Sequence, residues 1–341
     1  MTINNLKLTN YRNHEKLELD FSNKINSIVG SNGTGKTNVL EAIYLLATTK
    51  SFRAKYDRNL IMYNKNFTNI KCQITNEEFD DILELSVIKS PRFENASSKK
   101  AKVNGTIKTV HNFAGTLNAV LFSPENLNII TGTPSIRRHY LNLVLTQVNE
   151  KYKKIFSDYT KVIKQRNKLL EKINETGKGQ EQLNYWDDKA INLGNYIQKV
   201  RSDYFKFLGR SNNKENISFE YKLNSITQER MESKRSAEIA TKNTLCGPHR
   251  DDFIILQEEK DMSQFGSRGQ QRTAIFTLKI LEMEYMEQEL GHRPILLLDD
   301  IFSELDKEHS NLVYGLAKRQ QTIITSTNLP DNINKDNIIK L

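Results

Sequence analysis

The first third of the chain alternates apolar and polar residues with the period of two that is typical of half-buried β-strands. In Lys16–Phe21, for example, three apolar residues alternate with charged ones. The pattern predicts that Ile3–Leu8 and Lys16–Phe21 are paired strands, and that Thr68–Ile74 and Ile82–Ile88 form an antiparallel pair. The dipeptide Asn104-Gly105 predicts the turn of a further hairpin.

The middle of the chain changes to the three- and four-residue spacing of apolar positions that predicts amphipathic helices. This spacing runs from about residue 134 to about residue 208 and is broken once, at Gly177–Gly179. Thr133-Pro134-Ser135 supplies a helix start, and Ser123 is expected to cap another helix at Pro124. Ile217–Leu223 is then expected to be a strand, and the polar residues 224–244 allow either a short helix or a loop.

Three short strands are expected to be buried, because each is a mainly apolar run bounded by polar or turn residues. They are Ile25–Val29, Ala119–Phe122 and Ile295–Leu298. A further strand is expected at Phe253–Leu256, fed by the tight turn Cys246–Phe253. Its run of ionisable residues at 249–252 does not predict a metal site, because adjacent aspartates on a strand point to opposite sides.

The strand Ile25–Val29 leads into a sequence that fits G-x-x-x-x-G-K-[ST], the phosphate-binding loop. Its glycines allow the backbone N–H groups to turn inward around phosphate oxygens, and the helix that follows directs its N-terminal dipole at them. Lys36 is expected to reach the β- and γ-phosphates, and the Thr37 hydroxyl to ligate Mg²⁺. The predicted nucleotide-binding residues are Gly30, Ser31, Asn32, Gly33, Thr34, Gly35, Lys36 and Thr37.

The buried strand Ile295–Leu298 ends in two carboxylates, Asp299 and Asp300. Ligands bind at the carboxyl ends of parallel strands, so Asp299 is expected to hold the Mg²⁺ shell beside Thr37. Asp300 is then expected to orient or deprotonate the attacking water. Alone, this stretch would be read as a buried strand with a polar exit, and the phosphate loop is what favours the functional interpretation.

A second anion cradle is predicted at Phe265–Arg272, where glycine and serine open a strong helix. Ser267, Gly269 and Gln270 are its candidate phosphate contacts. Two such helix ends serve one nucleotide if they come from different protomers; otherwise the chain binds two phosphate groups. An ordinary capped helix is the alternative.

Composition narrows the class of protein. The 341 residues carry a net charge of +9, which favours a polyanionic partner such as nucleic acid, although a plain basic surface is the alternative. Two cysteines exclude a disulfide framework and a cysteine metal cluster. There is no apolar run of membrane-spanning length and no secretion signal, so no membrane association and a cytoplasmic location are expected.

Three groups of basic residues are candidate nucleic-acid contacts, and each has a plainer alternative. Lys50, Arg53 and Lys55 surround Phe52, which can equally belong to a solvated loop with the ring packed inward. The lysines before Asn104 either contact phosphates or protect an edge strand. The first long helix has a basic face that is either solvated or lies beside DNA, formed by Lys151, Lys153, Lys154, Lys161, Lys164, Arg166 and Lys168.

The order of these motifs resembles that of ATP-binding-cassette ATPases, and more narrowly the RecF family of DNA-repair proteins. The match spans almost the whole chain and is carried by residues 10–13, 30–43, 50–53, 121–125, 246–252, 267–271 and 297–306. The resemblance implies an α/β head of the ABC type, with a mixed sheet and helices, and an inserted helical lobe. The expected head comprises residues 1–130 and 245–341, and the mainly helical lobe comprises 131–244. Packing of the helix 267–289 with this lobe is a further expectation.

The resemblance also implies a function. Such proteins are recombination mediators that bind ATP and Mg²⁺, dimerise with ATP, and bind DNA at single-strand gaps or junctions. They act with RecO and RecR to help load RecA in gap repair and replication restart, and belong to the response to DNA damage (SOS). Ser267, Gly269 and Gln270 would contact the ATP that the loop of a second protomer holds. Weak ATP hydrolysis would reset the dimer.

Two departures from related ATPases limit what the resemblance carries over. Most ABC ATPases have glutamate where this chain has Asp300, and the shorter carboxylate is consistent with slow turnover. The switch histidine of transporters is absent, and Thr327 is the substitute in that strand-end position; the Q-loop glutamine has no clear equivalent.

Three rival functions make different demands on the sequence. A Rad50- or SMC-type ATPase would need several hundred residues of coiled coil, which this chain lacks. A transporter ATPase subunit would show the histidine. A nucleotide-gated DNA-binding module with negligible turnover remains open.

Overall fold

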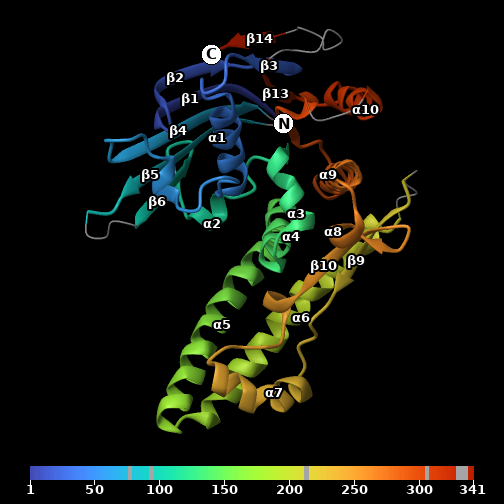
Figure 1. The fold of residues 1–341 in the computed structure, drawn as a ribbon. Helices are drawn as coiled ribbons and strands as arrows, with labels where there is room; N and C mark the ends of the chain where they lie inside the picture. The colour runs from blue at the N-terminus through green and yellow to red at the C-terminus, as the bar shows by residue number, and fades with distance from the viewer. Residues whose placement is uncertain (76–78, 92–95, 211–214, 304–306, 328–336) are drawn as a thin grey trace. The chain divides into compact units, whose positions relative to one another are not determined.

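The computed structural model describes residues 1–75, 79–91, 96–210, 215–303, 307–327 and 337–341. The chain forms two compact units (Figure 1). The first consists of Met1–Asn126 with Glu282–Leu341, and the second of Leu127–Leu281. The sequence-based boundaries at 130/131 and 244/245 remain a prediction about functional domains, and by packing alone residues 245–281 group with the helical unit.

The centre of the first unit is a five-stranded, fully parallel sheet in the order β14-β3-β13-β12-β8. All three strands expected to be buried lie in it. The bounds are β3 Ile25–Val29, β8 Ala119–Phe122, β12 Ile295–Asp299, β13 Thr322–Ser326 and β14 Asn337–Lys340. Helix α1 (Lys36–Thr48) follows β3, and α10 (Lys307–Ala317) precedes β13. Because all strands are parallel, the carboxyl ends of β3, β13 and β12 meet at one edge, which is where parallel sheets bind their ligands.

The other layer of the first unit is a six-stranded antiparallel sheet in the order β2-β1-β4-β5-β6-β7. It confirms the strands predicted from alternation, including a hairpin at Asn104-Gly105, whose residues both have positive φ. Its bounds are β1 Thr2–Tyr11, β2 His14–Asp20, β4 Phe67–Thr75, β5 Asp80–Lys89, β6 Ser97–Val103 and β7 Thr106–Lys108. The short helix α2 (Val110–Phe113) links this sheet to β8.

The second unit is mainly helical, as predicted. Its helices are α3 Asn128–Thr131, α4 Pro134–Val148, α5 Glu150–Thr176, α6 Leu183–Leu208, α7 Gln228–Thr241 and α8 Met262–Phe265. A three-stranded antiparallel sheet joins them, with β9 Ile217–Lys222, β10 Asp252–Gln257 and β11 Lys260–Asp261. Helix α9 (Arg268–Leu290) begins in this unit and continues into the first. None of the described helices is long and apolar enough to span a bilayer.

Two predictions about helix ends have different outcomes. The undecided polar stretch 224–244 contains the helix α7, whose first turn is capped by the Thr227 hydroxyl. The predicted Ser123 cap is wrong: the Asn126 side chain accepts a bond from the Ser123 backbone N–H, and the Ser123 hydroxyl is buried without a partner among the described residues. The side chain of Asn126 thus closes this turn in place of the Ser123 hydroxyl.

The predicted basic face of α5 needs correction at two positions. Lys153 and Arg166 are buried, at 2% and 0% exposure. Arg166 donates to Asp187 at 2.7 Å, to Glu238 at 2.6 Å and to the Thr244 hydroxyl at 2.9 Å. Burying an arginine is tolerable only with such partners, and they tie α5 to α6 and α7. These two residues therefore serve the core of the second unit rather than its surface.

Candidate nucleotide-binding site

The loop Gly30–Thr37 joins β3 to α1 as the sequence predicted, and its glycines are required by its shape. Gly33 and Gly35 have φ of 87° and 102°, a region that side chains rarely tolerate. A Cβ on Gly35 would also collide with His14 and with the Asn13 Oδ1, 2.6 Å away. A Cβ on Gly30 would lie 2.6 Å from the backbone oxygen of Leu341. The loop is thus closely packed on the side opposite to its opening.

Several N–H groups at the mouth of the loop are left to bind an acceptor from outside. Among the described residues, no hydrogen-bond acceptor contacts the backbone N–H groups of Gly33, Gly35, Lys36 or Thr37. Helix α1 has no side-chain cap and no acidic residue in its first turn. Uncapped N–H groups and the helix dipole together favour a bound anion, so this cradle fits a phosphate.

Lys36 lies within the loop at 8% exposure, and its Nζ donates to the carbonyl oxygens of Gly30 at 2.7 Å and Ser31 at 3.0 Å. These neutral acceptors hold the ammonium group in place without cancelling its charge. The lysine therefore remains available to pair with a phosphate, which is the role that the motif predicts.

Asp299 ends β12 and lies 4% exposed between two threonines. Its Oδ1 accepts bonds from the hydroxyls of Thr37 at 2.8 Å and Thr325 at 2.7 Å. Burial raises the pKa of this carboxyl, and the two hydroxyl bonds oppose that rise. The sequence-predicted pair Thr37 and Asp299 is thus brought together, and its oxygens have the hard character that Mg²⁺ prefers.

Asp300 follows in the left-handed region, with φ of 48°, and is exposed at the same pocket. Its backbone N–H donates to Thr325, to the carbonyl oxygen at 3.1 Å and to the hydroxyl at 3.2 Å. Left-handed backbone is unfavourable for a residue with a Cβ, and Thr325 holds it there. Thr325, at the end of β13, therefore contacts both aspartates. The sequence had instead suggested Thr327, which is exposed beyond β13 and does not line the pocket.

Three contributors to the site were not predicted for it. Asn13 donates to the carbonyl oxygens of Gly33 and Thr34, at 3.2 and 3.1 Å. Asn38 donates to Asn13 at 2.7 Å and accepts from Arg53 at 3.3 Å. Arg53, considered only as a DNA contact, lines the pocket. All three lie in segments that carry the family resemblance, but no local pattern around Asn13 marks it as a neighbour of the loop.

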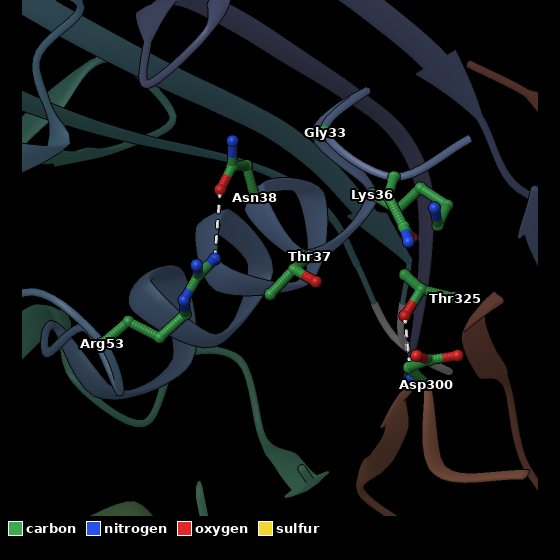
Figure 2. Close-up of a pocket in the computed structure, with 9 residues that line it drawn as sticks. Gly33, Lys36, Thr37, Asn38, Arg53, Asp300 and Thr325 are labelled. Atoms are coloured by element: carbon green, nitrogen blue, oxygen red, sulfur yellow. Dashed lines mark hydrogen bonds between the residues drawn. The ribbon is translucent and has the colours of Figure 1, made fainter. Parts of the chain in front are cut away.

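These groups surround a pocket of about 230 Å³ (Figure 2). It is lined by the phosphate loop, the start of α1, Arg53, Asp300 and Thr325. In the close-up, Lys36 and Asp300 lie on the same side of the loop, with Thr325 beside Asp300. Cationic donors, a helix end and the Asp300 carboxylate thus converge on the pocket, and Asp299 is bonded to two of its lining residues, Thr37 and Thr325. Such an arrangement can bind a triphosphate with a divalent cation and hold a water beside it.

The other basic residues of the 50–55 loop fit both of the interpretations left open. Phe52 packs edge-on against Tyr44, with ring centroids 5.8 Å apart, whereas Lys50 and Lys55 are exposed. The Ser51 hydroxyl donates to Glu41 at 2.5 Å, and Arg12 donates to both oxygens of the same carboxylate, at 2.8 and 2.5 Å. This buried cluster anchors the loop to α1.

The predicted second cradle lies in the second unit, at the start of α9. Ser267 and Gln270 form reciprocal bonds, the Ser267 Oγ accepting from the Gln270 N–H at 3.3 Å and the Gln270 Oε1 from the Ser267 N–H at 2.9 Å. Both are exposed, and no atom lies within 4 Å of a Cβ built on Gly269. The helix end is thus open to an incoming group. Glu304, Leu305 and Asp306, which belong to the resemblance, lie outside the described residues.

Comparison with known proteins agrees with this geometry. Residues 2–341 match the family described as "RecF/RecN/SMC N terminal domain". The chain is 36% identical to the "DNA replication and repair protein RecF" of Bacillus cereus, over 96% of this chain and 92% of that protein.

Two solved structures are also similar. One, described as the recombination mediator protein RecF-ATP in the RecFOR pathway, superposes with a TM-score of 0.91 at 30% identity and covers 99% of this chain and 95% of that one. A Pyrococcus furiosus Smc head domain, with a TM-score of 0.51 and 15% identity, covers 96% and 89% and shares the fold.

Proposed function

The chain belongs to the RecF family of SMC-like ABC ATPases, whose members act in DNA replication and repair, and from this premise we propose that it is an ATP-dependent DNA-binding recombination mediator. In this proposal ATP bridges two copies of the chain, and the bridged dimer binds DNA at single-strand gaps or junctions. With RecO and RecR it helps to load RecA, and slow hydrolysis of ATP resets the dimer. The RecFOR pathway named for a similar solved structure supports these partners.

The observation that carries the proposal is the open cradle at α1 combined with the pair Thr37 and Asp299. The residues fit ATP and Mg²⁺: N–H groups and Lys36 for the phosphates, a hydroxyl and a carboxylate for the cation. Mg²⁺ holds few protein ligands and keeps waters and phosphate oxygens, so no larger carboxylate cluster is needed. When bound, the cation would neutralise charge that develops on the phosphates.

Each side chain then has a role. Lys36 offsets phosphate charge, and Thr37 and Asp299 hold the cation. Asp300 is the candidate base, because it is an exposed carboxylate at the pocket whose backbone is fixed by Thr325. Aspartate reaches less far than glutamate, so a weak ATPase is expected, with negligible turnover as the alternative.

Dimerisation follows from the second cradle. Ser267, Gly269 and Gln270 are exposed, and the helix end they form suits the γ-phosphate of ATP held by a second copy. The +9 charge supports DNA as the partner of the dimer. A cytoplasmic location and a place in the SOS response accord with this function and remain part of the proposal.

Sedimentation velocity with and without ATP and Mg²⁺, and then with gapped DNA, tests the proposal. We expect a monomer that becomes a dimer with ATP, and Lys36→Ala should abolish both dimerisation and DNA binding. A protein that stays monomeric at saturating ATP, Mg²⁺ and DNA would refute the bridge.

A mixing experiment tests whether the two cradles act between copies. Lys36→Ala and Ser267→Arg chains should each fail to dimerise alone. Mixed, they can form one intact composite site, so dimers should reappear only if the cradles meet in trans.

Asp300→Asn distinguishes a switch that hydrolyses ATP from a module that needs only occupancy. In the first case, the variant should bind DNA with ATP but release it more slowly than the unmodified chain. Unchanged release, together with loss of binding in Lys36→Ala, would favour the module.

A further inference from the structure

A second cavity, of about 310 Å³, lies wholly within the helical unit. Its walls come from α4, α5, α6 and the turn Pro248–His249, which belongs to the ionisable run that the ATP site does not use. No aspartate or glutamate is among the described residues that line it. Its volume is in the range of cavities that hold small ligands, and a lining with an arginine and without carboxylates disfavours a cationic ligand.

One wall of the cavity presents hydrogen-bond donors. Arg138 and Asn142 lie one turn apart on α4. Arg138 donates through Nη1 to the carbonyl oxygen of Asp251 at 2.9 Å, and no carboxylate of the described residues pairs with it. The Asn142 Oδ1 accepts from Tyr152 and Arg201, both at 2.9 Å, which leaves the amide NH₂ as its remaining group. Both side chains are thus set to donate to an acceptor from outside.

The nearby carboxylates are already committed to other partners. Asp251 is fully buried and accepts from Arg201 at 2.9 Å, from Gln198 at 2.8 Å and from Tyr221. Asp252 forms a two-point pair with Arg137, at 2.6 and 2.9 Å. Asp252 and Asp251 favour the charge of Arg138 from nearby, but neither carboxylate pairs with it, and an arginine with free donors favours a phosphate or a carboxylate.

His249 adds no charge to the cavity. Its two ring nitrogens contact the Tyr159 hydroxyl at 2.7 Å and the Thr244 carbonyl oxygen at 3.0 Å. Burial lowers the pKa of His249 to about 4, so the ring is neutral at physiological pH. Arg138 is consequently the group that would decide the charge of a ligand.

Helix α5 supplies two apolar residues to the lining of the cavity, beside Tyr159 and Thr160. Phe156 and Ile163 line it, and both are partly exposed. The Phe156 ring is held by stacking on Tyr152, with an interplanar angle of 4° and ring centroids 6.1 Å apart. An aromatic ring that is held by stacking and lines the same cavity as an arginine offers a face for a planar base.

We propose that this cavity binds one unpaired nucleotide of single-stranded DNA, its phosphate on Arg138 and Asn142 and its base against Phe156. The inference rests on the proposed DNA-binding function and gives it a single-strand site. Nucleic acid suits the surroundings better than an acidic peptide, because exposed lysines recur along α5 and match a repeating backbone charge. They are Lys151, Lys154, Lys161, which also pairs with Asp158, and then Lys164, Lys168 and Lys172. A paired base cannot enter a cavity, so duplex DNA is excluded from this site.

The test compares binding of a fluorescent oligothymidylate and of a blunt duplex to the full chain with ATP, by anisotropy. Arg138→Gln and Phe156→Leu should each lower single-strand affinity by about tenfold and leave duplex affinity and ATP binding unchanged. Lys168→Gln is the matched control, since it removes one exposed charge of α5 outside the cavity. This control should weaken both DNA forms slightly and equally.

Photocrosslinking to the unmodified chain gives a readout that does not depend on a variant folding. A 4-thiothymidine oligonucleotide should crosslink within the peptide that contains Phe156, and inorganic phosphate alone should not displace it. Equal losses for single strand and duplex in Arg138→Gln, crosslinks elsewhere, or displacement by an acidic peptide but not by DNA would each overturn the inference. If the unmodified chain binds no DNA in any nucleotide state, the proposed function itself fails, whereas unaffected variants with normal binding refute only this site.

Discussion

Replacing Thr325 with valine tests the support of the buried carboxylate at the nucleotide site. Valine keeps the shape of threonine but removes the hydroxyl that donates to Asp299 at 2.7 Å. The change also removes the bond that the hydroxyl accepts from the Asp300 N–H at 3.2 Å, but that N–H keeps the Thr325 carbonyl oxygen as an acceptor at 3.1 Å. A hydrogen bond to a charged group contributes about 2 kcal/mol, and at 4% exposure water cannot replace it. We therefore expect the free energy of unfolding to fall by about 2 kcal/mol at neutral pH.

The dependence of this loss on pH identifies its cause. Burial already raises the pKa of Asp299 above the ordinary pKa of an aspartate. As the pH rises from that ordinary pKa through the raised one, the buried carboxyl loses its proton and the free energy of unfolding falls. Without the Thr325 bond, the pKa rises further. The gap between variant and unmodified chain should therefore widen as pH rises, and become small at acidic pH, where both carboxyls are protonated.

Urea unfolding between about pH 4.5 and pH 8 measures the gap, with Thr322→Val as control. Thr322 is buried on the same strand, but its hydroxyl donates to the neutral carbonyl of Ala317 at 3.0 Å. Its removal should cost about 1 kcal/mol at every pH. A Thr325→Val loss that does not change with pH, or that equals the control, would show that Asp299 does not depend on this bond. Mg²⁺-dependent ATP binding should shift to higher pH in Thr325→Val for the same reason.

Three further changes have defined outcomes. Gly35→Ala should abolish ATP binding, measured by titration calorimetry, because its Cβ meets Asn13 and its φ is 102°, whereas Gly315→Ala, in open space, should not. Arg53→Ala should weaken ATP binding with little effect on stability, while Lys55→Ala, outside the pocket, should leave ATP binding intact. If Lys55→Ala weakened ATP binding and Arg53→Ala did not, Arg53 would be assigned to DNA alone. Glu238→Ala should lower the free energy of unfolding of the helical unit by about 3 kcal/mol, since it removes one of the two carboxylates that pair with the buried Arg166, and a similar value for the exposed Glu232→Ala would contradict this.

The parts of the fold that local chemistry determines were predictable from sequence. The phosphate loop, the strand ending at Asp299 and the Asn104-Gly105 hairpin each depend on residues within about ten positions of one another, so motif and periodicity sufficed. The contact between Thr37 and Asp299, 262 positions apart, was also predicted, because the order of motifs implied it.

Side chains that reach the site through tertiary packing were not predictable in the same way. Asn13 leaves the turn between β1 and β2 and meets the loop only because the antiparallel sheet lies against it. Thr325 was missed from the sequence, which singled out only Thr327, just beyond the same strand, as the substitute for the switch histidine. The position at which β13 ends is what brings Thr325 into contact with the aspartates. A difference of two residues at a strand end is beyond what periodicity can resolve.

Arg166 shows how a signal in the sequence can be present and be given the wrong weight. It falls on the apolar stripe of α5, four residues after Val162 and three before Leu169, where a solvated arginine would be out of place. Its burial with Asp187 and Glu238 follows from that position. Asp251 repeats the pattern on the other side of the helical unit, where an ionisable run at a strand start proves to be the acceptor for Arg201 and Tyr221. A charged residue on an apolar stripe is therefore better read as one half of a buried pair, and the search for its partner should begin among the ionisable residues that have no other role.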